Sequence, residues 1–387
     1  MRDNRFIPIA RPDLGEAEAE AARRVILSGW VAQGPEVDAF EHEFAAAVGA
    51  PYAIAMSSGT AALTLSLMAL GIGAGDEVIT VSHSFIATAN AVRNAGARPV
   101  FVDIQPATLN MDPAGIAAAI TPRTRALLVV HQLGLPCDLG AILHIANRHG
   151  LPVVEDAACA IGSEIAMADG RQRIGRPHGV LACFSFHARK VVTSGEGGMI
   201  TTSDVTLDRQ LRALRNHGAD IAAHERHAAG DVVVERYTAP GHNQRMTDIQ
   251  AAVGRVQLAK LPALVARRRA LAERYGRLLR PLTWLEVPIE PAWARGNWQS
   301  YCVRLAEGVD QRQVMRHLLD HGIATRRGVM CAHREPAWPP GTWSCGPAGL
   351  AHSEAAQDRG LMLPLYPALS DADQDRVAVA LATVPAP

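Results

Sequence analysis

The chain has 387 residues, of which 48% are hydrophobic and 20% charged, and its 38 basic and 38 acidic residues give a formal net charge of zero. This composition is typical of a globular protein and excludes a disordered chain or one that recruits nucleic acid by bulk positive charge. At about 150 residues per domain, the length predicts two or three domains.

The start of the chain and its cysteines bear on where the protein works. Charges appear from Arg2 onward with no apolar signal-peptide core, and no later segment approaches the roughly 20 apolar residues of a membrane span. The six cysteines are scattered without a CxxC pair, which predicts neither a disulfide framework nor a zinc site, and no metal is expected. We therefore expect a cytoplasmic protein that binds neither membranes nor nucleic acid.

The first half of the chain alternates short β-like runs with helical stretches. Strands are predicted over 52–56, 76–81, 98–104, 126–132 and 151–156, and helices over 61–72, 84–96, 112–120 and 138–150. This alternation predicts an α/β fold with a mostly parallel sheet sandwiched between helices. Ligands of such folds gather at the carboxyl ends of the strands.

The pattern changes near residue 247, where residues 247–279 predict one long amphipathic helix that Pro262 should bend or split. We place the domain boundary here, with a large domain over residues 1–250 and a smaller α+β domain over 251–387 that includes the long helix. The smaller domain is predicted to contain a strand over 298–306, helices over 310–322 and 369–383, and a proline- and tryptophan-rich loop over 335–347.

Small residues follow the first predicted strand in "AIAMSSGTAAL" (53–63). In a turn that opens a helix, the backbone N–H groups around Gly59 and Thr60 form a site for a phosphate dianion. An ordinary helix N-cap explains the same residues without a ligand. Neither GxxxxGK(S/T) nor GxGxxG occurs, so a nucleotide P-loop or a Rossmann fingerprint is not supported.

Asp156 ends an apolar predicted strand in "LPVVEDAACAIG" (151–162), which places it at the ligand edge of the sheet. A carboxylate there can hold a proton on a heterocyclic nitrogen or bind a cation, and it can equally cap the next helix. Cation binding needs acidic partners, and the adjacent Glu155 alternates to the other side of the strand.

Lys190, in "FSFHARKVVTSGEGGMI" (184–200), is one of only two lysines in the chain. Lysine can lose its proton and form a Schiff base with an aldehyde, which arginine cannot do, so imine chemistry is a candidate role. The alternative is that an arginine-rich composition left two lysines by chance. The second, Lys260, is expected at a solvated position of the long helix.

Asn243 and Arg245 precede the long helix in "APGHNQRMTDIQAAVGRVQL" (239–258). A polar turn capped by Thr247 or Asp248 explains them without a function. Any functional role for these two residues depends on the resemblance described next.

Taken in order, these motifs resemble the DegT/DnrJ/EryC1/StrS family of pyridoxal-phosphate enzymes, mostly sugar aminotransferases with the fold-type I architecture. The matching stretches span nearly the whole chain: "LSGWVAQGPEVDAFEHEFA", "SSGTAAL", "SHSFIATANAVRNAGARPVFVDI", "VEDAACAIGS", "FSFHARKVVTSGEGGM", "RNHG", "GHNQRMTDIQAAVGRVQL" and "LPLYP". The resemblance implies a large domain with a mostly parallel central sheet, a smaller C-terminal α+β domain, and pyridoxal 5'-phosphate as the cofactor.

The resemblance also implies how the cofactor phosphate is held. By position, the phosphate contacts fall on Gly59 and Thr60, and the hydroxyl of Ser185 adds another. Asn243 occupies the position that reaches the phosphate of the neighbouring subunit. A homodimer with shared active sites is therefore implied.

Four further positions are implied to surround the cofactor ring. Phe85 stacks on the pyridine, Asp156 pairs with the protonated ring nitrogen, and Lys190 forms the Schiff base and moves the proton. Cys159 stands where many members have a glutamine that bonds the phenolic oxygen. A thiol is a weak donor, so the electronic tuning of the ring is expected to differ here.

The reaction implied is amino transfer from L-glutamate to the keto group of a nucleotide-linked sugar, which gives an amino sugar. Arg327 and His333 lie in "GIATRRGVMCAHREPAW" (322–338) and are candidate sugar-site residues, because guanidinium groups suit a diphosphate or a donor carboxylate. Arg245 is a further candidate, ranked after these two. A solvated basic loop explains this segment equally well.

Two other functions remain open. The acceptor can be a cyclitol or another ketone of secondary metabolism, because fold does not fix substrate. The chain can also be a non-catalytic regulator that binds pyridoxal phosphate. The sequence disfavours that regulator, since it has no helix-turn-helix extension, no basic face and no linker to a partner module.

Overall fold

The largest element of the computed structural model, which describes residues 6–221 and 230–385, is an eight-stranded sheet. Its strands are β1 (Tyr52–Met56), β2 (Glu77–Val81), β3 (Arg98–Val102), β4 (Thr124–Val130), β5 (Val153–Asp156), β8 (Leu181–Ser185), β9 (Gly198–Thr202) and β14 (Ser344–Cys345). They lie in the order β1-β9-β8-β5-β4-β2-β3-β14, and neighbours are parallel except β1 with β9 and β9 with β8. The mostly parallel sheet predicted from the sequence is confirmed.

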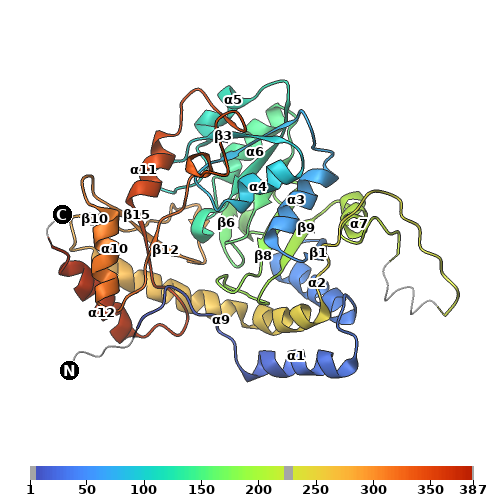
Figure 1. Cartoon of the computed structure of the whole chain (residues 1–387), viewed down its shortest axis with the longest axis horizontal. Coiled ribbons are helices and arrows are strands. Elements are labelled where there is room, and N and C mark those ends of the chain that lie inside the picture. The colour runs from blue at the N-terminus through green and yellow to red at the C-terminus, as the bar shows by residue number, and fades with distance from the viewer. Residues whose placement is uncertain (1–5, 222–229, 386–387) are drawn as a thin grey trace.

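Helices cover both faces of this sheet, because successive side chains of each strand point in opposite directions. In β1, Ala53 and Ala55 join one buried cluster, whereas Ile54 and Met56 join another. Helices that close the first cluster are α2 (Pro35–Val48), α6 (Leu139–Arg148) and α9 (Asp248–Leu279), and those that close the second are α3 (Gly59–Ala69), α4 (Ala87–Asn94) and α7 (Val205–Leu214). Figure 1 shows the sheet enclosed between these helices.

Three elements differ from the sequence prediction. The helix expected over 84–96 begins only at Ala87, because the preceding residues turn, with Ser84 N donating to Ser82 O at 2.9 Å. The helix expected over 112–120 is reduced to the 3-10 turn η1 (Pro113–Gly115) and the single turn α5 (Ile116–Ala119), since Pro122 disfavours helical backbone just before it. The loop expected over 335–347 contains β14, an edge strand beside β3.

Helix α9 is continuous over 32 residues that include Pro262, so the expected split at this proline does not occur. Packing compensates for the hydrogen bond that proline cannot donate, since Leu258 and Leu261 are both buried in the first cluster. The helix packs against α1 (Glu16–Ser28) and α2, and its second half reaches α12 (Asp371–Ala382). Figure 1 shows it running beneath the length of the molecule.

Lys260 is partly solvated, with 34% of its side chain exposed, but it also pairs with a buried carboxylate. Its Nζ lies 2.6 Å from Oε1 of Glu18 on α1, and Glu18 is only 3% exposed. Burial acts to raise the pKa of Glu18, but hydrogen bonds from Lys260, Gln257 and the start of its own helix bring it below the ordinary value. The lysine therefore compensates a buried carboxylate between α1 and α9.

A second sheet follows in the C-terminal part of the chain. Its antiparallel strands, in the order β10-β12-β15-β13, are β10 (Leu285–Glu286), β12 (Tyr301–Leu305), β15 (Gly360–Leu363) and β13 (Arg326–Arg327). This sheet packs with α10 (Gln311–Asp320), α12 and the end of α9 around a separate core. The remaining elements are α11 (Ala351–Arg359) and a three-stranded sheet of β11 (Ala294–Arg295), β6 (Glu164–Met167) and β7 (Gly170–Arg173).

The domain division at residues 250 and 251 stays a prediction. Strand pairings and bridges cross it, among them β14 with β3, β11 with β6, and the parallel bridge of Ile7 near the N-terminus with Ile323. Within residues 6–221 and 230–385, no helix combines the length and the apolar character needed to cross a membrane.

Candidate active site

The turn between β1 and α3 has the geometry of an anion site. Ser58 is the N-cap of α3, and its hydroxyl accepts from Ala61 N at 3.1 Å, so the N-cap interpretation is confirmed for this residue. The backbone N–H groups of Gly59 and Thr60 lie in the first turn, where a helix supplies no acceptor, at the positive end of its dipole. The cap by Ser58 therefore does not use the N–H groups of Gly59 and Thr60, and their role as a phosphate site stays a prediction.

Ser185, at the end of β8, lies directly against this turn. A side chain on Gly59 would place its Cβ 2.7 Å from Cβ and 3.2 Å from Oγ of Ser185, closer than atoms can approach. Glycine is required here because β8 and the start of α3 meet so closely. The structure thus brings together Gly59, Thr60 and Ser185, which the sequence resemblance assigned to one phosphate.

The segment around Asn243 adjoins the same turn. Ser57 N donates to Gln244 O at 2.8 Å, and Ser57 Oγ donates to Gln244 Oε1 at 2.6 Å. The side chain of Asn243 is exposed, whereas Arg245 Nη1 donates to Asn216 Oδ1 at 2.6 Å. The structure therefore leaves Asn243 able to reach outward, and it gives Arg245 a partner within its own chain.

The turn before α9 also contains the predicted local cap. Thr247 is the N-cap of α9, and its hydroxyl accepts from Gln250 N while the Gln250 side chain accepts from Thr247 N. The capping interpretation of this turn is confirmed for Thr247.

Asp156 is the last residue of β5 and is 5% exposed. Its Oδ2 accepts from Thr88 Oγ1 at 2.7 Å, and its Oδ1 accepts from Ala158 N at 3.2 Å. The Thr88 hydroxyl lies in turn 2.7 Å from Ser84 Oγ. The carboxylate is therefore fixed at the carboxyl edge of the sheet by the first turn of α4.

The cation interpretation of Asp156 gains no support from its surroundings. No cluster of three or more histidine, cysteine or acidic side chains suited to a metal occurs in the part of the chain that the structure describes. The neighbouring Glu155 faces the other way, where His131 Nε2 lies 3.0 Å away and Gly179 N donates at 2.8 Å.

Lys190 follows β8 and its side chain is half-buried. Its Nζ donates to Cys159 Sγ at 3.0 Å, and Cys159 lies in the turn that follows Asp156. The Cys159 carbonyl accepts from Asn297 Nδ2 at 2.8 Å, so a residue of the C-terminal part holds this turn in place. A primary amine, a fixed carboxylate and a row of backbone N–H groups thus occur along one edge of the sheet.

Phe85 lies between β2 and α4 at the same edge of the sheet. Its side chain is 63% exposed, which is unusual for a large aromatic ring. The exposure leaves one face of the ring free for a planar ligand. Its stacking role stays a prediction.

His333 and Arg327 already have partners in the structure. His333 Nδ1 lies 2.6 Å from Ser82 Oγ, and His333 Nε2 lies 3.0 Å from Glu354 Oε1. Arg327 Nη2 donates to Glu335 Oε1 at 2.8 Å. His333 therefore lies beside Ser82, which follows β2 and precedes Phe85 by three residues. Arg327 has no hydrogen bond to any of the other candidate residues.

Sequence reasoning missed three polar residues that support this edge: Thr88, Asn297 and His83. Thr88 holds Asp156 and Asn297 holds the Cys159 turn, across separations of 68 and 138 residues. His83 is fully buried, and neither of its ring nitrogens has a hydrogen-bond partner among the described residues. Burial lowers its pKa to about 4, and the nearby Asp103 acts in the opposite direction.

We expect the protein to lose about 2 kcal/mol of stability as the pH falls from 7 to 5 because of His83. Its folded pKa is about 4 against 6.5 for an ordinary histidine, so the unfolded chain binds the proton first. The stabilisation is fully present above 6.5 and is lost as the pH falls toward 4. Urea unfolding at both pH values checks this. His83→Leu should lack that share of the loss, and an equal loss in both proteins would contradict the assignment.

Comparisons with known proteins agree with this geometry. The model of the DegT/DnrJ/EryC1/StrS aminotransferase family matches residues 12–382. The aminotransferase TlmJ from Streptoalloteichus hindustanus is 36% identical with a TM-score of 0.88, and the match covers 98% of this chain and 100% of that chain. DesV from S. venezuelae, solved in complex with a ketimine intermediate, is 36% identical with a TM-score of 0.84, over 94% and 93%. Spr1654 from Streptococcus pneumoniae, solved in its PMP form, is 26% identical with a TM-score of 0.89, over 98% of each chain.

Proposed function

The chain belongs to the DegT/DnrJ/EryC1/StrS aminotransferase family, and from that premise we propose that it transfers an amino group from L-glutamate to the keto group of a nucleotide-linked sugar. It is a pyridoxal-phosphate-dependent aminotransferase of fold type I, as its relatives are. The observation that carries the proposal is the half-buried Lys190 amine, 3.0 Å from the thiol of the turn that follows Asp156.

The residues at the sheet edge fit pyridoxal phosphate. The close approach of Gly59 to Ser185 leaves only small side chains beside the N–H groups of α3, which suits a phosphate dianion. Asp156 is buried and anchored by Thr88, which suits a protonated ring nitrogen. When bound, the cofactor supplies an electron sink that stabilises negative charge on the α-carbon of the donor.

We assign the remaining roles to this chain's own residues. Gly59, Thr60 and Ser185 hold the phosphate, Asp156 keeps the ring nitrogen protonated, and Phe85 covers one face of the ring. Lys190 is the covalent anchor and, once displaced, the base that accepts the proton from the donor's α-carbon. Cys159 accepts a hydrogen bond from the Lys190 amine, and because sulfur is a weak acceptor it orients that amine only weakly.

A homodimer with shared sites is part of the proposal. Exposed apolar side chains gather shortly before Asn243, where Val232 is 88%, Val234 79% and Tyr237 65% exposed. Exposed apolar side chains this close together on one irregular segment favour burial against a second copy. Asn243, whose side chain is exposed, would then reach the partner's phosphate site. Light scattering of the holoenzyme should give a dimer, and a monomer with full activity would contradict shared sites.

We further propose a cytoplasmic location.

The acceptor is tested by a turnover assay with L-glutamate and a panel of ketones. Nucleotide-linked keto-sugars should support release of 2-oxoglutarate, whereas the free keto-sugars should be poor substrates. A cyclitol enzyme would accept a keto-cyclitol and ignore the nucleotide sugars. A regulator would bind pyridoxal phosphate without turning over any member of the panel.

Arg327 offers a test of nucleotide recognition. Arg327→Ala should raise the KM for the nucleotide-linked acceptor about tenfold, leave kcat nearly unchanged and leave the KM for glutamate unaltered, because a guanidinium fork suits a diphosphate. Glu335→Gln is the matched variant, since Glu335 Oε1 forms an ion pair with Arg327 Nη2 at 2.8 Å and the substitution removes its charge. Freeing the arginine should lower the acceptor KM. Equal kinetics in all three proteins would remove Arg327 from the site.

A further inference from the structure

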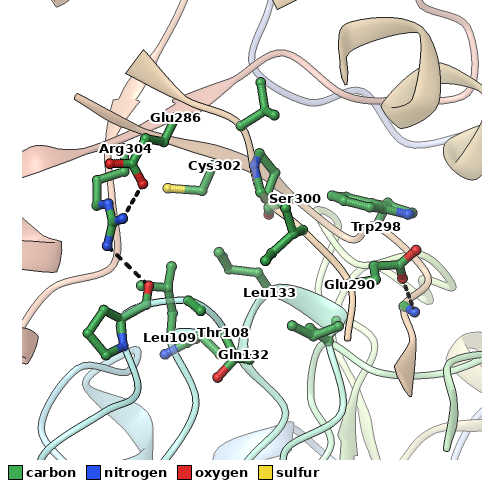
Figure 2. Close-up of a pocket in the computed structure, with 18 residues that line it drawn as sticks. Thr108, Leu109, Gln132, Leu133, Glu286, Glu290, Trp298, Ser300, Cys302 and Arg304 are labelled. Carbon is green, nitrogen blue, oxygen red and sulfur yellow. Dashed lines mark hydrogen bonds and ion pairs between the residues drawn. The ribbon is translucent and has the colours of Figure 1, made fainter. Parts of the chain in front are cut away.

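A cavity of about 220 Å³ lies between the turns that follow β3 and β4 and the start of the second sheet. Figure 2 shows Leu109 and Leu133 on one side of it and Trp298, Ser300, Cys302 and Arg304 on the other. None of the residues that we assign to the cofactor, the donor or the acceptor lines it. The cavity is therefore separate from the proposed active site.

Backbone strain concentrates at this cavity. Four non-glycine residues in the described ranges have positive φ, and three of them, Leu109 (60°), Leu133 (58°) and Trp298 (54°), line it. Leucine and tryptophan have no short polar side chain to stabilise this conformation, which costs about 1 kcal/mol or more for each residue. The three strained residues come from separate segments, so their convergence is not the consequence of one turn.

The walls are mostly apolar, and their charges are already paired. Figure 2 shows Arg304 beside Glu286, with which it pairs. Arg304 Nη1 also donates to the carbonyl of Pro106 at 3.3 Å, and Glu290 accepts from the backbone N–H of Gly296. No ionised group of the lining thus requires a charged ligand. The indole of Trp298 stacks on Tyr301 with ring centroids 5.6 Å apart, which gives the cavity a rigid aromatic wall.

One buried polar group in the lining remains without a partner among the described residues. Arg304 Nε is buried and has no hydrogen-bond acceptor among the described residues. Figure 2 shows the side chain of Ser300 in the lining as well, which adds a hydroxyl to the wall of the cavity. A buried donor without an acceptor is costly, and a ligand with one polar atom would satisfy it.

We propose that this cavity binds a small neutral aromatic molecule with a single hydroxyl or similar polar group. An apolar cavity of about 150 Å³ already accommodates benzene, so this larger one has room for a substituted ring. The ring would lie against Leu109, Leu133 and Trp298. The polar group would meet Arg304 Nε or the Ser300 hydroxyl.

The cavity is one layer of residues from Lys190. Gly134, in its wall, has so little space that a Cβ there would overlap the Asn297 side chain and lie 3.0 Å from the Cys159 carbonyl. Asn297 Nδ2 donates to that carbonyl at 2.8 Å. The cavity thus does not contain Lys190, but it adjoins the Cys159 turn, which contacts Lys190.

The test uses 4-methylphenol as the probe, titrated calorimetrically into the holoenzyme. We expect one site with a dissociation constant of about 1 mM or below, as suits a ligand of this size. The matched charged analogues, 4-methylbenzoate and 4-methylbenzylamine, should bind at least about tenfold more weakly. Lys190→Ala should bind the probe as the wild type does, because the cavity does not include the active site.

Ser300→Phe fills the cavity and should weaken the probe at least about tenfold. Val379→Phe adds the same ring at a position that is 63% exposed on α12, and it should leave binding unchanged. If Ser300→Phe does not fold, Ala107→Phe, on an exposed residue of the lining, replaces it. The proposal is overturned if the wild type shows no saturable binding, if a folded filled variant binds as tightly, or if Lys190→Ala abolishes binding.

Discussion

Lys190→Ala is expected to lower kcat by at least about 10³-fold and to abolish the covalent link to the cofactor. The residue combines two roles that no neighbour can take over: its amine forms the imine bond, and it accepts the proton from the donor's α-carbon. The hydrogen-bond partner of its Nζ is the Cys159 thiol at 3.0 Å, which cannot form an imine. The measurement is steady-state turnover, together with mass spectrometry of the borohydride-reduced protein, which should show a modified Lys190 peptide only in the wild type.

The chain provides its own control in Lys260, the other lysine. Lys260→Ala removes the partner of the buried Glu18 and should lower the free energy of unfolding while leaving kcat within about twofold. A loss of activity that is equal in the two variants would show that folding, not imine chemistry, explains the first result. Retained activity in Lys190→Ala would contradict the assigned role outright.

Asp156→Ala should have the second largest effect, a loss of about 10²- to 10³-fold in kcat with weaker cofactor binding. The carboxylate is 5% exposed and fixed by Thr88, so the ring nitrogen would lose a preorganised anion that water cannot replace as well. The measurements are kcat at saturating pyridoxal phosphate and the cofactor dissociation constant.

Thr88→Val serves as the graded control. It removes the 2.7 Å hydrogen bond but keeps the carboxylate and the volume of the side chain, so kcat should fall only about tenfold. If Asp156→Ala is as active as Thr88→Val, the charge of Asp156 has no role in catalysis.

The sequence predicted the elements and residues whose signal is local. The helix period of 247–279 and the strand that ends at Asp156 are visible in a short window of residues, and the structure has both. The scarcity of lysine drew attention to Lys190, and the small residues of "SSGTAAL" indicated the start of a helix, which the structure has at Gly59. These predictions needed no knowledge of tertiary contacts.

The supporting contacts could not be predicted, because they join residues far apart in the chain. Nothing near Thr88 in the sequence identifies Asp156 as its partner, and nothing near Asn297 indicates the Cys159 turn. The ion pair of Lys260 with Glu18 could not be predicted for the same reason, since it depends on how α1 packs across α9. Pro262 does not split α9, because tertiary packing outweighs one missing hydrogen bond.

The most direct test of the central claim is the absorbance spectrum of purified wild type and Lys190→Ala, recorded with pyridoxal phosphate before and after addition of L-glutamate. The account predicts a visible, near-violet band in the wild type that glutamate bleaches toward the near-ultraviolet, and no such band in the variant. A wild type without the band after reconstitution would contradict covalent binding at Lys190. A band that glutamate leaves unchanged would contradict glutamate as the amino donor.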